Sequence, residues 1–196
     1  MSARPLNVLF LCTHNSARSV LAEATLNHIG KGRFQAFSAG SSPRENQQPN
    51  PLALQVLQNA GIATEGLRSK SWDEFGQPDS RARRAGPPQA SAAPSGGSAL
   101  HEVKSVGAVP LMDLVITVCD NAAGEVCPYW PGQPATAHWG YADPSDVEGD
   151  EAKKLEAFRQ TLFAIRRRLE LLINLPPEKL ARAMVQQAAR DLAKQA

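Results

Sequence analysis

Four short apolar runs, each bounded by turn residues, set the pattern of the chain. They cover about residues 7–11, 34–39, 114–118 and 135–139. Runs of this length between polar residues, glycine or proline are typical of buried strands. The stretches between and after them carry apolar residues at helical spacing. The pattern therefore predicts strands that alternate with helices.

The first two predicted helices cover residues 16–29 and 51–60. The second has Pro51 at its first position, where the missing N–H is not needed, and Gly61 as a cap just past its end. A short element is expected around residues 69–75. The helix at 51–60 and this short element lie between the second and third strands.

The helix at residues 150–174 is the clearest element of the chain. It ends before Pro176, and a weaker helical tail is expected over 176–196. Its apolar residues step by three and four positions, so they form one stripe along the helix. The stripe consists of Leu155, Phe158, Leu162, Ile165, Leu169 and Leu172.

Strands that alternate with helices predict the α/β class, with a parallel sheet covered by helices on both faces. A chain of 196 residues can bury one good core, so we expect a single domain over residues 1–196. Ligands of such sheets bind at the carboxyl ends of the strands. Cys12 and Cys119 each follow a predicted strand, so both thiols are expected at that same edge.

Residues 77–109 differ in kind from the rest of the chain. From position 76 to position 99 there is no large aliphatic or aromatic side chain. Such a stretch cannot bury enough apolar surface to offset the entropy lost on ordering. We interpret it as a disordered insertion, with a return to order over 100–109.

Composition narrows the functional classes. The net charge of +2 gives no reason to expect a nucleic-acid or membrane partner, and no apolar run reaches membrane-spanning length. The chain enters its first strand without a hydrophobic signal segment, which favours a cytoplasmic protein. Three cysteines do not make a disulfide scaffold at this length. In a reducing compartment they are catalytic, redox-active or simply buried.

The turn after the first strand carries the most specific chemistry. Cys12 ends the strand, and Arg18 and Ser19 open the helix. Backbone N–H groups of such a turn, at a helix N-terminus, form a pocket for an oxyanion. Their field is expected to lower the pKa of the thiol and favour the nucleophilic thiolate, and the planar fork of Arg18 suits a tetrahedral oxyanion. The expected oxyanion-binding residues are Thr13, His14, Asn15, Ser16, Ala17, Arg18 and Ser19.

The Cys-x5-Arg-Ser pattern, placed after the first strand, resembles the low-molecular-weight phosphatase superfamily. The resemblance implies a three-layer α/β/α fold with a central parallel sheet of four strands. It implies that Ser19 donates a hydrogen bond to the thiolate, and we expect Asn15 to hold the loop open in a left-handed backbone conformation. Asp143-Pro144 resembles the family's aspartate-proline loop, whose aspartate is the general acid.

The segment from Cys119 to Cys127 resembles the redox segment of arsenate reductases built on this fold. The resemblance implies arsenate reduction through a Cys12 adduct, followed by a disulfide relay from Cys12 to Cys119 to Cys127. No bound cofactor is expected. The implied reductant is an external thiol, either thioredoxin or glutaredoxin with glutathione. A metal site is not expected, because Cys119 and Cys127 lack the further ligands that zinc needs.

Two alternatives remain. A tyrosine phosphatase would hydrolyse phosphate monoesters with Cys12, Arg18 and Asp143 alone. Phosphatases of this fold usually carry aromatic residues just after the aspartate-proline pair and a second cysteine just before the arginine. Here Ser145 follows Pro144, and Ala17 precedes Arg18, which disfavours that alternative. A non-catalytic oxyanion-binding module is also disfavoured, because nothing in the loop has been lost.

Overall fold

A parallel sheet lies at the centre of the computed structural model, which describes residues 4–76, 110–119 and 134–176. The bounds of β1, β2, β3 and β4 are Leu6–Cys12, Phe34–Gly40, Leu114–Thr117 and Ala135–His138. Their order across the sheet is β2-β1-β3-β4, and every neighbouring pair is parallel. The predicted α/β class and parallel four-stranded sheet are confirmed.

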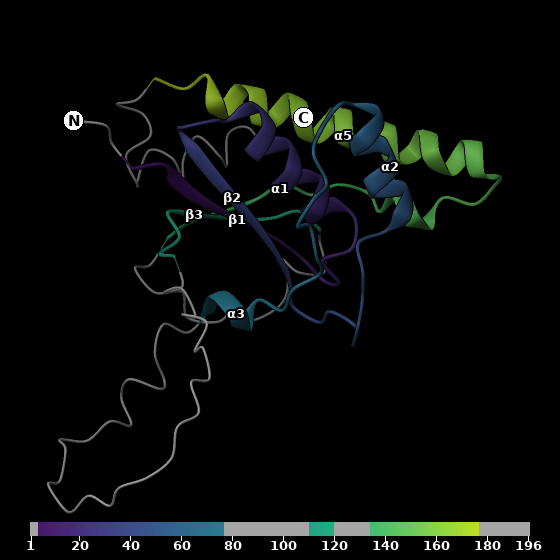
Figure 1. Ribbon diagram of the computed structural model, residues 1–196, viewed down its shortest axis with the longest axis horizontal. Coiled ribbons are helices and arrows are strands. Elements are labelled where there is room, and N and C mark those ends of the chain that lie inside the picture. Colours follow the sequence, from purple (N-terminus) through teal and green to yellow (C-terminus); the bar gives the residue numbers. More distant parts are fainter. Residues whose placement is uncertain (1–3, 77–109, 120–133, 177–196) are drawn as a thin grey trace, which may run out of the picture.

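Helices lie on both faces of this sheet (Figure 1). In the part of the chain that the structure describes, α1 (Arg18–Ile29), α2 (Pro51–Asn59) and α5 (Glu151–Ile173) pack against one another on one face. The one-turn helix α3 (Asp73–Gly76) lies on the other. The three layers are therefore present, with unequal cover on the two sides.

Strand β1 is buried on both faces because it supplies side chains to two apolar clusters. Val8 and Phe10 face the larger cluster, under α1, α2 and α5. Leu9 and Leu11 face the smaller one, which includes Phe75 of α3. A strand that is covered on both faces has a continuous run of apolar residues. The sequence pattern therefore predicted β1 to within one residue at each end.

Helix α5 follows the predicted stripe. Five of its six stripe residues are buried, and Leu155 at the N-terminal end is half-buried. Asp150 caps the helix by accepting a hydrogen bond from the Lys153 backbone N–H at 2.9 Å. In α2, Pro51 occupies the first turn, and Gly61 follows the helix end with a left-handed φ of 70°. Both sequence-based predictions for α2 are confirmed.

Some predictions fall outside the described residues. These are the insertion at 77–109, Cys127, and the tail beyond Pro176. The single-domain organisation stays a prediction. Among the helices of the described ranges, none combines the length and the apolar character needed to cross a membrane.

Candidate active site

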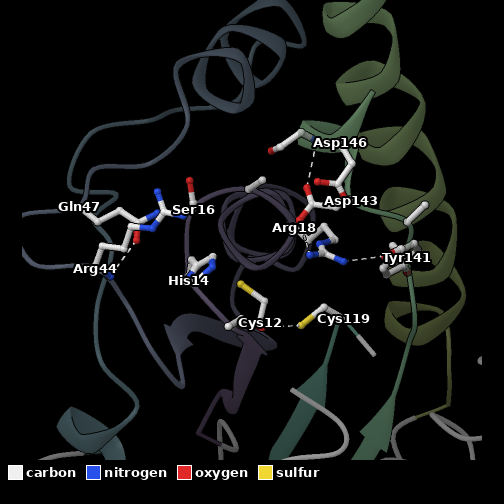
Figure 2. Close-up of a pocket in the computed structure, with 14 residues that line it drawn as sticks. Cys12, His14, Ser16, Arg18, Arg44, Gln47, Cys119, Tyr141, Asp143 and Asp146 are labelled. Carbon is white, nitrogen blue, oxygen red and sulfur yellow. Dashed lines mark hydrogen bonds and ion pairs between the residues drawn. The ribbon is translucent and has the colours of Figure 1, made fainter. Parts of the chain in front are cut away.

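A cavity of about 600 Å³ opens at the carboxyl edge of the sheet (Figure 2). Cys12 ends β1 in its floor, and Cys119 follows β3 beside it. Arg44 and Gln47 form one wall, and Tyr141 and Asp143 lie on the other side. Cys12 and Cys119 therefore lie together at this edge, as predicted.

The sulfur of Cys12 is surrounded by the loop that follows it. The backbone N–H of Asn15 donates to Cys12 Sγ at 3.1 Å, and Ser19 Oγ lies 2.8 Å from the same sulfur. Asn15 adopts φ 53°, the left-handed conformation predicted for it. This conformation turns the backbone so that an N–H can point back at the sulfur.

The predicted direction of the Cys12 pKa is wrong. Cys12 is only 4% exposed, and its burial raises the pKa of the thiol above its ordinary value. The hydrogen bond from Ser19 and the backbone N–H of Asn15 lower it, and the nearby Cys119 raises it further. The sequence indicated the donors around the sulfur but not the desolvation that outweighs them.

Asn15 holds the loop from below. Its side chain donates to Ser19 Oγ at 2.9 Å and to Ser38 Oγ at 2.8 Å. Its Oδ1 accepts from the backbone N–H of Lys70 at 2.7 Å, and its carbonyl oxygen accepts from Ser69 Oγ at 2.7 Å. Three separate segments, α1, β2 and residues 69–70, thus fix the turn.

Gly40 lets β2 approach the loop closely. A Cβ atom there would lie 2.7 Å from the carbonyl oxygen of Thr13, 2.9 Å from the carbonyl carbon of His14 and 3.0 Å from the backbone nitrogen of Asn15. All three are backbone atoms, so no side chain could rotate to make room. The sequence pattern identified Gly40 only as the stop of a strand.

Arg18 and Asp143 are paired across the cavity. Arg18 Nη2 lies 2.5 Å from Asp143 Oδ2, and Nη1 donates to the carbonyl oxygen of Tyr141 at 2.8 Å. The other carboxylate oxygen of Asp143 accepts from the Ser145 backbone N–H at 3.0 Å, which caps the 3-10 turn η2 (Pro144–Asp146). The carboxylate is therefore held at the cavity wall beside the guanidinium.

Cys119 shares the cavity with Cys12. Both cysteines are buried free thiols, at 2% and 4% exposure, and Thr13 Oγ1 lies 3.6 Å from Cys119 Sγ. Val118 donates to the carbonyl oxygen of Leu11 at 2.8 Å, so the sheet pairing runs up to the residues that precede the two cysteines. The sheet therefore brings together two thiols that are far apart in the sequence.

Five of the seven predicted oxyanion-binding residues line the cavity, namely Thr13, His14, Ser16, Ala17 and Arg18. Asn15 and Ser19 are fully buried behind it. His14 Nδ1 lies 2.9 Å from the carbonyl oxygen of Ser42, and a carbonyl can only accept, so this ring nitrogen carries the hydrogen. The His14 side chain thereby braces the loop against the segment after β2.

The chain is similar to a known phosphatase family and to known arsenate reductases. Residues 7–79 match the family model described as low molecular weight phosphotyrosine protein phosphatase. A curated arsenate reductase of Bacillus licheniformis is 30% identical over 164 residues, which cover 83% of this chain and 91% of the relative. The chain belongs to the arsenate reductase family of the low-molecular-weight phosphatase superfamily.

Two solved structures share the fold of this family member. An arsenate reductase from Archaeoglobus fulgidus aligns with a TM-score of 0.54 at 23% identity, over 86% of this chain and 99% of that one. A low-molecular-weight protein tyrosine phosphatase from T. tengcongensis aligns with a TM-score of 0.53 at 18% identity, over 84% and 95%. The three-layer fold is thus common to reductases and phosphatases.

Several cavity residues of this arsenate reductase family member were not predicted from the sequence. Arg44 and Gln47 line one wall, and Tyr141 lines the other. The backbone N–H of Arg44 donates to Gln47 Oε1 at 2.9 Å, which closes a short turn at the rim. No local pattern marked Arg44 or Gln47, whereas an aromatic residue two positions before Asp143 could have been noticed.

Proposed function

We propose that this protein reduces arsenate to arsenite, with Cys12 as the nucleophile and Cys119 as the second thiol. One observation carries the proposal. Two free, buried cysteines line a single cavity that also holds an arginine and a carboxylate. A hydrolase needs one such thiol, whereas a reductase needs a second to take over the sulfur of the first.

The cavity suits a tetrahedral oxyanion. The loop from Thr13 to Arg18 lines the cavity above Cys12, and the Asn15 backbone N–H points at the sulfur. We propose that the N–H groups of this loop, at the start of α1, hold the oxyanion. Arg18 supplies a charged, planar pair of donors, and Arg44 adds a second positive charge on the facing wall. The oxyanion competes with Asp143 for Arg18, because that guanidinium already has a carboxylate partner.

In the first step the sulfur of Cys12 attacks arsenic, and a sulfur–arsenic bond replaces an arsenic–oxygen bond. The thiol proton passes to arsenate, and the departing oxygen leaves as water. Burial keeps the Cys12 thiol protonated more than usual, so the basic oxyanion is a suitable acceptor for this proton. Asp143 is proposed as the acid that protonates the leaving oxygen, since it lies at the cavity wall beside Arg18. It takes up a proton from solvent when the oxyanion displaces it from Arg18, and it gives that proton to the leaving oxygen.

In the second step the sulfur of Cys119 attacks the sulfur of Cys12. A disulfide forms, the sulfur–arsenic bond breaks, and its electron pair leaves with arsenic. Arsenic is reduced from the +5 to the +3 state while the two thiols are oxidised together. The proton of Cys119 passes to an oxygen of the departing arsenite. Thr13 Oγ1 lies 3.6 Å from Cys119 Sγ, so the hydroxyl can hold that sulfur in place during this transfer.

In the last step Cys127 attacks Cys119 and releases the thiol of Cys12, and an external dithiol reduces the new disulfide. We propose thioredoxin or glutaredoxin with glutathione as that donor. The relay needs free thiols between turnovers, which suits the predicted cytoplasmic location because that compartment keeps thiols reduced.

Phosphate-ester hydrolysis is a second activity of the same site. Cys12, Arg18 and Asp143 are all that it needs, and the fold is shared with a tyrosine phosphatase. Phosphate and arsenate have nearly the same shape and charge. We expect this hydrolysis to be weak, since no aromatic residue follows Pro144 in the 3-10 turn to stack on a substrate ring.

The deciding experiment compares the parent with Cys119→Ser and Cys12→Ser. Arsenate turnover is coupled to purified thioredoxin and glutaredoxin systems in parallel, and hydrolysis of an aryl phosphate is measured beside it. Cys119→Ser is expected to abolish arsenate turnover and leave ester hydrolysis largely intact, while Cys12→Ser removes both. Loss of both activities in a folded Cys119→Ser variant contradicts the second-thiol role. Arsenate reduction that survives Cys12→Ser shows that the nucleophile is misassigned.

A further inference from the structure

Arg168 is a buried arginine on the core-facing side of α5. It is 6% exposed, and its neighbours one turn away in each direction, Ile165 and Leu172, are fully buried. A guanidinium keeps its positive charge at every pH at which a protein is folded. A full charge is costly to remove from water unless a partner compensates it. The contacts of Arg168 therefore indicate what the residue does.

The contact that the structure gives Arg168 is an aromatic ring. Its Cζ atom lies 4.6 Å from the centroid of the Tyr141 ring. Within the described ranges no carboxylate pairs with Arg168, and its Nε and Nη1 atoms are buried without a hydrogen-bond partner. Burial raises the pKa of Tyr141 to about 12, so the phenol carries no charge at neutral pH. The contact is therefore a cation–π interaction at a desolvated position, where such contacts are strongest.

Tyr141 links this contact to the catalytic cavity. Its backbone carbonyl accepts a hydrogen bond from Arg18 Nη1 at 2.8 Å, while Arg18 Nη2 lies 2.5 Å from Asp143 Oδ2 (Figure 2). Among the described residues, these are the two contacts of the Arg18 guanidinium. Helix α5 also packs against the 3-10 turn η2, which begins at Pro144. Arg168 thus lies behind the part of the wall that holds Arg18.

The two contacts of Arg18 respond differently to a bound oxyanion. An oxyanion competes with the Asp143 carboxylate for Nη2, because both are anionic acceptors. The Tyr141 carbonyl is neutral and bonds to the other nitrogen, so it can keep its hydrogen bond while Asp143 is displaced. In the part of the chain that the structure describes, this carbonyl is then what still ties the guanidinium to the cavity wall.

We infer that Arg168 is a positioning residue for Arg18: it fixes the Tyr141 ring, and the Tyr141 carbonyl holds Arg18 while the oxyanion replaces Asp143. Arg168 does not line the cavity, so it acts through Tyr141. This role rests on the proposed function, in which Arg18 binds the oxyanion. It also gives a reason for a charge in the core, since a planar guanidinium stacks on a ring in a defined orientation.

A purely structural role gives the opposite expectation for stability. Arg168→Met introduces an uncharged side chain of similar length, and it removes a buried charge and two buried donors without partners. Such a change is neutral or stabilising when no acidic partner is left behind. We therefore expect the melting temperature of Arg168→Met to stay at or above that of the parent, although oxyanion binding weakens. A residue that only supported the core would lower the melting temperature when it is replaced.

The test measures phosphate binding to the full reduced chain by titration calorimetry, together with kcat and KM for aryl-phosphate hydrolysis. Arg168→Met is expected to weaken phosphate binding and to raise KM, each about tenfold, because the loss falls on binding. The change in kcat should stay below about threefold, because the Ser145 backbone N–H still holds the Asp143 carboxylate. Arg167→Met, at the next and exposed position of α5, removes the same charge and leaves all three values unchanged.

Tyr141→Leu removes the ring and keeps the backbone carbonyl, so it should weaken phosphate binding as Arg168→Met does. The double variant Tyr141→Leu, Arg168→Met should lose no more than either single variant, because Arg168 acts through the ring. Arg168→Lys keeps the charge without the planar group, so it should recover only part of the binding. Full recovery in Arg168→Lys, with a further loss when Arg168→Met is added to Tyr141→Leu, would mean that the charge acts directly and would overturn the role.

Unchanged phosphate binding in folded Arg168→Met or in folded Tyr141→Leu overturns the inference, and the second variant decides if the first does not fold. An equal loss in Arg167→Met also overturns it, because any charge on α5 would then suffice. A parent that binds no phosphate overturns the oxyanion site of the proposed function, and this role with it. That result is distinguishable from a parent that binds phosphate no more tightly than its variants, which removes the role of Arg168 alone.

Discussion

Arg18 and Asp143, 125 residues apart in the chain, form an ion pair at 2.5 Å across the mouth of the cavity. The pair occupies the guanidinium that the oxyanion needs. A bound oxyanion would therefore have to share the Arg18 guanidinium with the Asp143 carboxylate. This arrangement makes binding and acid catalysis separable by mutation.

Asp143→Asn is expected to slow aryl-phosphate hydrolysis by ~10²–10⁴-fold, because the proposed general acid is lost. Inhibition by inorganic phosphate should become tighter, because Arg18 is released and one negative charge leaves the cavity. The measurements are kcat and the inhibition constant of phosphate. Asp146→Asn is the control, since Asp146 lines the same cavity and has no ion pair among the described residues. Equal losses of kcat in both variants would contradict the role of Asp143.

Gly40→Ala is expected to damage the loop directly. The new Cβ would meet three backbone atoms at 3.0 Å or less, so Thr13, His14 and Asn15 must shift. A displacement of the reacting group by about 1 Å costs about 10²-fold in turnover. The crowding around the new Cβ is expected to cost about 1–3 kcal/mol in stability. Turnover and thermal unfolding are the measurements.

Gly32→Ala is the control for that prediction. Gly32 has a left-handed φ of 77°, and a Cβ there would have no atom within 4 Å. It should lose about 1 kcal/mol of stability through backbone strain alone and keep its turnover. Parent-like turnover in Gly40→Ala would show that the close contact with β2 does not hold the loop.

The pH dependence of Cys12 should move in opposite directions in two variants. Cys119 raises the pKa of Cys12, so Cys119→Ser lowers it and increases the thiolate fraction at a given pH. Ser19 lowers the pKa of Cys12, so Ser19→Ala raises it and decreases that fraction. Alkylation of Cys12 followed by peptide mass spectrometry from pH 6 to 10 gives both profiles. Shifts of the same sign would be incompatible with this account.

Deletion of residues 77–99 is expected to leave stability and arsenate turnover close to those of the parent. The prediction rests on composition, because the segment has no large apolar side chain to contribute to a core. Thermal unfolding and the coupled arsenate assay are the measurements. A large loss in either would mean that the segment packs or takes part in the reaction.

Much of the fold follows from local apolar spacing. The run from Val8 to Leu11 predicted β1, and the stripe from Phe158 to Leu172 predicted α5, because burial imposes a period that the sequence retains. The meeting of Cys12 and Cys119 was also predictable, since parallel strands end at a common edge.

Contacts between distant segments were not predictable in this way. Glu23 looks like an ordinary polar residue of α1, and its partner Lys70 is remote in sequence, so nothing local marks either as buried. The close approach of Gly40 to the loop is equally non-local. The Cys12 pKa was predicted in the wrong direction for the same reason, because desolvation depends on everything packed around the sulfur.

Asn15 is anchored by hydrogen bonds to α1, β2 and residues 69–70. These bonds indicate which of the two thiols has to move during the proposed catalytic cycle. A turn tied down at three places is stiff and cannot travel to meet another sulfur. In the proposed relay, we therefore expect the Cys119 side to make the approach that joins the two thiols and the retreat that follows, while the first sulfur stays stationary.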